Sequence, residues 1–325
     1  MEVPFCRTRF GGFGAIMKSS PFQFGRRFGL QLLLLGVAFT TAPIRAQNLA
    51  GDMALSLVLI GTEKWESVAS GYQFTDAACA DADGNFYFTD VAKGTNIFKV
   101  GHDDKVVSFI SNSPKISGLK FGPDGRLYAC QGGLKRLIAF DVPSGKQQLI
   151  AEGVEPNDLV VTRRGWIYFT ETGKKQVTLI DATGARRAVD TGINAPNGIT
   201  LSPDQGTLIV SDFRGTNLWA FRIDKDGSLS AKEPYMTVRA PLEKPDMASS
   251  DGMTTDSAGR YYVATAVGLQ MFDSTGRLGG VILKPQNKFL SNVTFAGPNL
   301  EYLYVTCADK VYRRKTKAHG VVFYK

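Results

Sequence analysis

Histidine is scarce in this chain, which has two among its 325 residues. His102 falls in a predicted turn and His319 lies close to the C-terminus, so neither is placed for a Ser-His-Asp relay. The sequence also lacks the HExxH zinc motif and the glycine-rich phosphate loop that ends in Lys and Ser or Thr. Chemistry that depends on paired histidines or on a P-loop is therefore excluded.

Cysteine is almost as rare, with four residues in the whole chain. Cys6 belongs to a predicted leader, which leaves Cys79, Cys130 and Cys307, and no two of them have the CxxC spacing of zinc or redox sites. All three occur in apolar or alternating segments, so we expect buried, small, hydrophobic side chains. A bridge between two of them after export, such as Cys79–Cys307, is left open.

No apolar run is long enough to cross a bilayer, and the run Leu32–Phe39 follows Arg26 and Arg27. Small residues follow up to Ala46, which gives the basic, apolar, small-residue order of an export signal. The sequence therefore predicts a leader over residues 1–46 and a periplasmic or secreted protein. The paired arginines leave both the general and the twin-arginine routes open, and Met17 is an alternative start.

A basic block of the kind that binds nucleic acid is also missing. The leader carries six basic residues and one acidic residue, or +5, so the whole-chain charge of +8 leaves +3 for residues 47–325. We therefore expect a small-molecule substrate, no nucleic acid and, after loss of the leader, no membrane. The sequence sets no oligomeric state.

What the chain does have is a repeat of about 40 residues, found six times. Each copy contains a short apolar strand, a turn such as Asp83-Gly84 or Asp124-Gly125, and a second strand rich in Tyr, Phe, Val, Ile and Thr. A third strand follows in most copies and a weaker fourth in several. These features predict an all-β fold, a single six-bladed β-propeller of four-stranded blades over residues 47–325.

Two apolar segments have no partner within their own repeat, Asp52–Ile60 and Gly320–Tyr324. We expect one terminus to supply an outer strand to the blade of the other, because this closes the ring and hides two sheet edges. The fifth copy begins late, and the extra residues between Phe221 and Ser250 predict a longer loop or hairpin near the mouth of the channel.

The first position of every copy is a short polar residue. In a propeller the innermost strands surround one axis, so these positions form a ring, and their oxygens are ligands suited to Ca²⁺ or Mg²⁺ and usable by Mn²⁺ or Zn²⁺. The same residue types also begin strands by bonding the backbone. Because six occur in register, we favour a polar site at Asp76, Ser117, Asn157, Asn197, Asp251 and Asn292.

Three motifs of the ring, Pro156–Leu159, Ala195–Gly198 and Ser250–Met253, resemble those of the SMP-30/gluconolactonase family of six-bladed propellers. The resemblance covers residues 72–324. It implies a divalent metal, with Ca²⁺ as the first choice and Zn²⁺, Mg²⁺ or Mn²⁺ as alternatives, bound by Asn197 and Asp251. It also implies that Asn157 binds water or substrate beside the metal.

Two departures from the family pattern stand out. Asp76, in Phe74–Ala78, takes the place of a glutamate that is the third metal ligand, and Glu155 takes the place of an arginine that contacts substrate in several members. The resemblance implies lactone hydrolysis, with the metal polarising the carbonyl and Asp251 as candidate base. Glu155, Ser117, Asn157 and Asn292 are the candidate substrate-binding residues. The alternative is a non-catalytic propeller that binds a ligand or protein around a structural metal.

Overall fold

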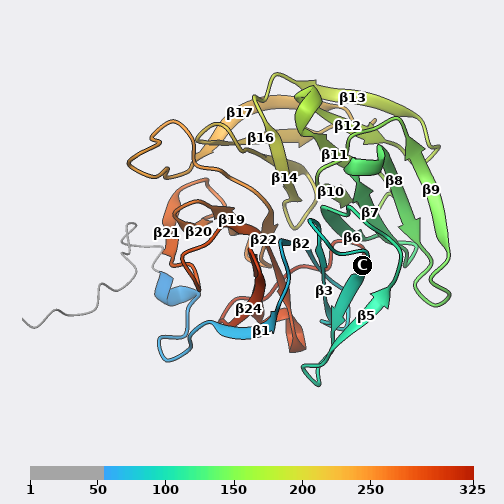
Figure 1. Cartoon of the computed structure of the whole chain (residues 1–325). Helices are drawn as coiled ribbons and strands as arrows, with labels where there is room; N and C mark the ends of the chain where they lie inside the picture. Colours follow the sequence, from blue (N-terminus) through green and yellow to red (C-terminus); the bar gives the residue numbers. More distant parts are fainter. Residues whose placement is uncertain (1–54) are drawn as a thin grey trace, which may run out of the picture. The chain divides into compact units, whose positions relative to one another are not determined.

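The computed structural model describes residues 55–325, so the predicted leader and the start of the segment Asp52–Ile60 lie outside the described residues. This part of the chain forms six antiparallel sheets of four strands each, arranged around one axis as a six-bladed propeller (Figure 1). No helix in it is both long and apolar enough to cross a membrane. The predicted fold class is confirmed.

In each of the first five blades the chain runs from the innermost strand outward. Blade 1 consists of β2 (Thr75–Ala80), β3 (Phe86–Asp90), β4 (Ile97–Val100) and β5 (Val106–Ile110). Blade 2 consists of β6 (Gly118–Phe121), β7 (Leu127–Gln131), β8 (Arg136–Phe140) and β9 (Gln147–Glu152). Blade 3 consists of β10 (Leu159–Val161), β11 (Ile167–Glu171), β12 (Gln176–Ile180) and β13 (Arg186–Thr191).

Blade 4 consists of β14 (Pro196–Leu201), β15 (Thr207–Asp212), β16 (Asn217–Ile223) and the long β17 (Leu229–Thr237). Blade 5 consists of β18 (Met253–Thr255), β19 (Tyr261–Thr265), β20 (Gly268–Phe272) and β21 (Leu278–Ile282). Four short 3₁₀ helices complete the elements: η1 (Leu55–Leu57), η2 (Gly132–Leu134), η3 (Thr172–Lys174) and η4 (Pro298–Leu300). The predicted insertion is divided between β17 and the loop of residues 238–252.

Blade 6 closes the ring with strands from both ends of the described chain. It combines β22 (Leu290–Ala296), β23 (Tyr302–Cys307) and β24 (Lys310–Lys315) with β1 (Glu66–Ser70), which pairs with β24 as the outermost strand. The predicted pairing of the termini is thus confirmed, but the N-terminal strand is β1 rather than the described part of the predicted segment, residues 55–60. Within that segment η1 packs Leu55 into the apolar core between blades 5 and 6, and Leu59 forms an isolated bridge with Thr316.

The turns between first and second strands follow their sequence signals. Gly84, Gly125, Gly165 and Gly259 have φ between +75° and +86°, the left-handed conformation that glycine adopts without strain. The second strands β3, β7, β11 and β19 are buried along their whole length. The three cysteines of the described chain are buried and unpaired, as expected of small apolar side chains.

The inner strands approach one another so closely that glycine is required beside the axis. A Cβ at Gly198 would lie 2.1 Å from the carbonyl oxygen of Asp251, and a Cβ at Gly252 would lie 2.2 Å from Cγ of Asn292. The glycines of the Asn197-Gly198 and Asp251-Gly252 pairs therefore let one inner strand pass against the next.

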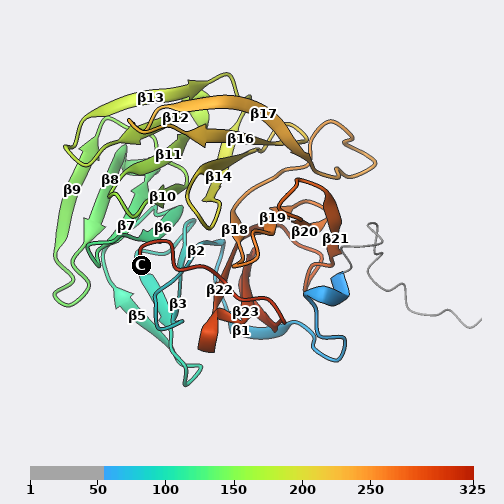
Figure 2. The ribbon, with the colours of Figure 1, turned by 180° about the vertical axis from the view of Figure 1, so that it is seen from behind.

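The two ends of the central channel differ. We call the end where the inner strands begin the mouth, and the other the far end. At the far end the C-terminal segment crosses the channel (Figure 2) and is held by a bridge from Gly320 to Asp256 and by a hydrogen bond from Gln205 Nε2 to the Phe323 carbonyl, 2.5 Å. The segment predicted as a strand, Gly320–Tyr324, is thus a cover over the channel.

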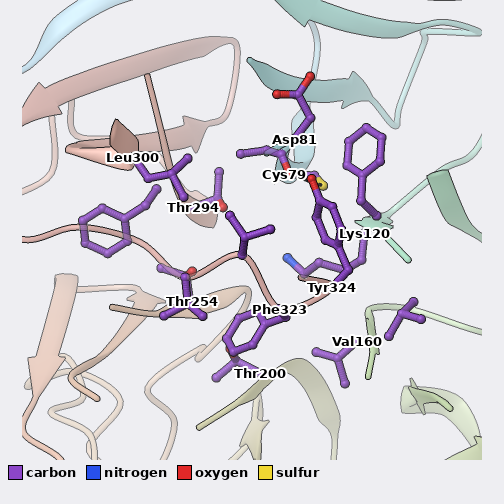
Figure 3. Close-up of a pocket in the computed structure, with 16 residues that line it drawn as sticks. Cys79, Asp81, Lys120, Val160, Thr200, Thr254, Thr294, Leu300, Phe323 and Tyr324 are labelled. Atoms are coloured by element: carbon purple, nitrogen blue, oxygen red, sulfur yellow. Dashed lines mark hydrogen bonds between the residues drawn. The ribbon is translucent and has the colours of Figure 1, made fainter. Parts of the chain in front are cut away.

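Beneath this cover lies a cavity of about 50 Å³, which Phe323 and Tyr324 help to enclose (Figure 3). Every inner strand contributes at least one residue to its lining, and these include Cys79, Lys120, Val160, Thr200, Thr254 and Thr294. Ligand pockets usually measure about 300–1,000 Å³, so this cavity is too small for a substrate. The mouth is the end at which a ligand can enter.

We expect Gly198→Ala to lower the free energy of unfolding by about 1–3 kcal/mol, because the added methyl group collides with backbone rather than with a movable side chain. Gly61→Ala is the matched control, since a Cβ there meets nothing within 4 Å. Urea unfolding of both variants measures the difference. Equal stability of the two would contradict the close approach at Gly198.

Candidate functional site

The first residues of the inner strands converge at the mouth. Asp76 is the second residue of β2, Asn197 the second of β14, and Asp251 lies two residues before β18. Each is at least nine-tenths buried, with exposed fractions of 9%, 8% and 9%. The structure therefore brings the three predicted metal ligands to the same end of the channel.

Asp76 and Asn292 are in direct contact. The Asn292 side chain donates from Nδ2 to Asp76 Oδ1, 3.2 Å, and the Ala77 amide donates to the same oxygen, 2.8 Å. The Asn292 amide oxygen accepts from the Val293 amide, 2.9 Å. Asn292 thus fixes the Asp76 carboxylate and has its own oxygen occupied by the backbone, which favours a positioning role.

The strand register shifts the sixth copy by one residue. Asn292 pairs with Thr306 on the second strand of its blade, and Gly118 pairs with Cys130 at the equivalent position of blade 2. Asn292 therefore aligns with Gly118, and Ser291 aligns with Ser117. The hydroxyl groups confirm this: Ser291 Oγ donates to the Thr75 carbonyl of the next blade, 2.7 Å, and Ser117 Oγ to that of Asn157, also 2.7 Å. Both serines therefore join neighbouring blades.

Asp158 is a site residue that the sequence-based assignment missed. It is 3% exposed, its Oδ1 accepts from the Leu159 amide, 2.8 Å, and no hydrogen-bond partner of its Oδ2 is found among residues 55–325. When the blades are aligned by their strand pairing, Asp158 occupies the position that Gly118, Gly198 and Gly252 occupy in blades 2, 4 and 5. An aspartate at a position that is glycine in three other repeats is the signal that could have revealed it.

The three buried carboxyl groups repel one another. Burial raises the pKa of Asp76 to about 7 and that of Asp158 to about 6, and it raises the pKa of Asp251 well above its ordinary value. The charge of Asp158 raises the pKa of both other aspartates, whereas the Lys120 ammonium lowers that of Asp158. Such a cluster favours protons or a bound cation as counter-charge.

Two further polar atoms near Asp251 are buried without partners. Among residues 55–325, the amide oxygen of Asn197 accepts no hydrogen bond. The hydroxyl group of Ser250 also has no hydrogen-bond partner there. A buried polar atom without a partner costs free energy, so it marks a place for an ion, a water or a ligand. The donor chemistry fits a divalent cation held by Asp76, Asn197 and Asp251, two carboxylates and one neutral oxygen.

The carboxylates alone do not complete such a site. Among residues 55–325, no group of three or more His, Cys, Asp and Glu side chains is arranged to hold a metal ion. A cation at the mouth would therefore depend on the amide oxygen of Asn197 as well as on the aspartates.

The other predicted residues line an open pocket of about 540 Å³ between blades 2 and 3. We call it the rim pocket and define it by Lys115, Ser117, Lys135, Glu155 and Asn157. The carboxylate of Glu155 forms a salt bridge with Lys135, whose Nζ lies 3.3 Å from Oε1. Asn157, which lines the rim pocket, directly precedes the buried Asp158 in the chain.

At the mouth three partly buried phenylalanines meet. Phe289 stacks on Phe74 with ring centres 5.9 Å apart and contacts Phe213 at 6.2 Å. Phe74 precedes Asp76 by two residues, and the Phe213 amide donates to the Ala195 carbonyl, two residues before Asn197. The sequence analysis did not anticipate this cluster of three rings, which we call the phenylalanine wall.

Comparison with known proteins agrees with the architecture and the motifs. The sequence profile of the SMP-30/Gluconolactonase/LRE-like region matches residues 74–309, which include all six inner strands. The chain belongs to this family. Among its relatives, a gluconolactonase of Zymomonas mobilis is 25% identical over 292 residues, covering 78% of this chain and 82% of the relative.

Other proteins similar to this chain are also named lactonases. The pentonolactonase XacC of Haloferax volcanii is 28% identical over 202 residues, or 59% of this chain and 67% of the relative. A solved gluconolactonase of Xanthomonas campestris superposes with a TM-score of 0.72 at 22% identity, covering 83% and 94% of the two chains. A calcium-binding regucalcin of Agrobacterium tumefaciens superposes at 0.67 and 16% identity, covering 81% and 98%. These two structures share the fold.

The buried carboxyl groups predict a pH effect on stability. In EDTA-treated protein the folded state holds protons on Asp158 up to about pH 6, whereas the unfolded chain loses them near pH 3.8. The folded state therefore binds more protons in this window, and its stability falls as the pH rises through it. We expect Asp158→Asn to reduce this fall, as measured by melting temperature between pH 3.5 and 7.

Asp103→Asn, on the exposed turn near His102, is the control and should keep the slope of the wild type. If the melting temperature had the same pH dependence in wild type and Asp158→Asn, the pKa of Asp158 would not be raised by folding.

Proposed function

We propose that this protein is a hydrolase that opens a lactone ring and depends on a divalent cation, with Ca²⁺ as the first choice. One observation carries the proposal. Three buried carboxyl groups and an unpartnered amide oxygen converge at the mouth of a channel whose far end is covered by the C-terminal segment. The lactonase names of the relatives supply the reaction class.

Asp76, Asn197 and Asp251 would hold the cation. When bound there, a divalent cation polarises a carbonyl group and lowers the pKa of water. Asn292 holds the Asp76 carboxylate in place. Charge interactions between such buried groups are stronger than in open water.

Asp251 is the candidate general base. In the cation-free protein, burial and the charges of Asp76 and Asp158 raise its pKa. A cation bound to Asp251 would counteract this rise, so the cation would share in activating the water. In the proposed reaction the water oxygen attacks the lactone carbonyl carbon and its proton passes to Asp251. The bond between this carbon and the ring oxygen then breaks, and the ring oxygen takes up a proton to leave a hydroxy acid.

We expect Asp251→Asn to lower the hydrolysis of D-glucono-1,5-lactone by at least about 100-fold, since a positioned base contributes about 10²–10⁴-fold. The rate above spontaneous hydrolysis is followed by acid release at constant pH. Asp103→Asn should retain wild-type turnover. Equal turnover of Asp251→Asn and wild type would remove Asp251 from the mechanism.

We expect Asp76→Asn to weaken divalent-cation binding by roughly tenfold, because it removes one of two charged ligands. Isothermal titration calorimetry with Ca²⁺, Mg²⁺, Mn²⁺ and Zn²⁺ on EDTA-treated protein measures the affinity. Unchanged affinity would exclude Asp76 as a ligand. Tight binding in the wild type without turnover of any lactone would support the alternative of a binding propeller with a structural metal.

A further inference from the structure

The charges of this propeller are divided between its two faces. The connections at the mouth join second to third strands and each blade to the next, and they contain ten basic residues. Apart from the buried Asp158 and Asp251 they contain four acidic residues, Glu155, Glu243, Asp246 and Asp309. The basic residues are Lys93, Lys115, Lys135, Lys174, Lys175, Arg214, Arg239, Lys244, Lys284 and Lys288.

The loops at the far end have the opposite balance. The connections between first and second strands and between third and fourth strands contain thirteen acidic and eight basic residues. When the buried Asp158 and Asp251 are counted, as the buried Asp256 and Asp273 are at the far end, the mouth loops carry 10 − 6 = +4 and the far-end loops 8 − 13 = −5. A protein whose net charge is modest therefore presents a positive entrance, which attracts anions and raises their local concentration.

Most of the positive charge at the mouth is free to act on a ligand. All ten basic residues except Lys284 are exposed. Among the described residues, carboxylates lie within salt-bridge distance of Lys135, Lys174 and Lys288 in this set. The remaining seven have no such carboxylate in that part of the chain, so their charge is neutralised only by solvent.

Two of the ten basic side chains, Lys115 and Lys135, line the rim pocket. Lys115 donates to the Ala92 carbonyl, 3.4 Å, and its stem lies against Gly133, where a Cβ would meet Lys115 Cβ at 3.1 Å. Lys135 ends the turn η2 and reaches Glu155. With one acid and two bases, the pocket has a net positive charge and a volume of the size that holds small ligands.

The backbone at these lysines is unusual. Lys115, Lys135 and Lys175 have φ of +61°, +53° and +54°, the left-handed conformation that glycine or asparagine adopts at lower cost. Nine other non-glycine residues among those described share this conformation, so it positions the three lysine side chains but does not by itself assign them a role.

We propose that the substrate carries a negatively charged group, a carboxylate or a phosphate, which binds Lys115 and Lys135 in the rim pocket while its lactone carbonyl lies at Asp251. This inference rests on the proposed lactonase function. It also gives the departure at Glu155 a meaning: the pocket supplies its positive charge from two lysines of blade 2, and Lys135 neutralises the acid.

The test compares three lactones: neutral D-glucono-1,5-lactone, carboxylate-bearing D-glucaro-1,4-lactone and 6-phospho-D-glucono-1,5-lactone. We expect kcat/KM to be higher for one or both charged lactones than for the neutral one, and the better charged lactone identifies the anionic group. Raising NaCl from 10 to 300 mM should lower kcat/KM for the charged lactones by several-fold, because salt shortens the Debye length from about 30 Å to below 10 Å. The value for the neutral lactone should stay constant.

The variant Lys115→Gln/Lys135→Gln should raise KM for the preferred charged lactone by roughly tenfold, the effect of losing one charge-assisted hydrogen bond, and should change KM for the neutral lactone much less. Lys146→Gln, on the far-end face, is the control with the same change of charge. Glu155→Gln should lower KM for the charged lactone.

Equal kcat/KM for neutral and charged lactones, or no effect of the double variant on the charged ones, would overturn the inference and leave the lactonase function standing. Absence of turnover for all three, in cation-loaded wild type, would instead refute the proposed function for these lactones. The two failures are therefore distinguishable.

Discussion

The close approach of six inner strands around one axis is the constraint on which this structure depends. The strands come so near that a Cβ at Gly198 would touch the backbone of the next blade. Only small or hydrogen-bonded polar residues fit where the strands begin, and their polar atoms are removed from water at once. The same crowding that closes the propeller therefore produces a cluster of buried carboxyl and amide groups.

This crowding also explains why the site requires a counter-charge. Asp76, Asp158 and Asp251 lose solvation together and repel one another, and Lys120 is the cation that acts most directly on Asp158. A structure that only needed to close a ring would gain stability from serine or glycine at these positions, as Ser117 and Gly118 show in blade 2. Retaining carboxylates there has a cost in stability, which points to binding or chemistry.

The repeat made the architecture predictable, because its turns and apolar strands occur in six regular copies. Strand β1 was harder to find, since Glu66–Ser70 is short, largely exposed and polar, as an outermost strand is permitted to be. The apolar residues 55–60 instead pack as a 3₁₀ turn and an isolated bridge. An apolar segment at a terminus predicts burial, but several local structures provide it.

The site was predictable where one residue of each repeat carried the signal, as at Asp76, Asn197 and Asp251. Asp158 was missed because it departs from the repeat rather than repeating it, and Asn292 was placed one residue out of register because its neighbour Ser291 is also polar. The basic rim has no local signal at all. Its residues come from separate loops, and only the direction of each strand decides which face they share.

Closure of one end and charge at the other act together on a ligand. The cover formed by Phe323 and Tyr324 leaves the mouth for both entry and exit. Opening a lactone creates a new carboxylate, so on the proposed chemistry the product carries one negative charge more than the lactone. The basic loops of the mouth therefore attract the product as well as an anionic substrate.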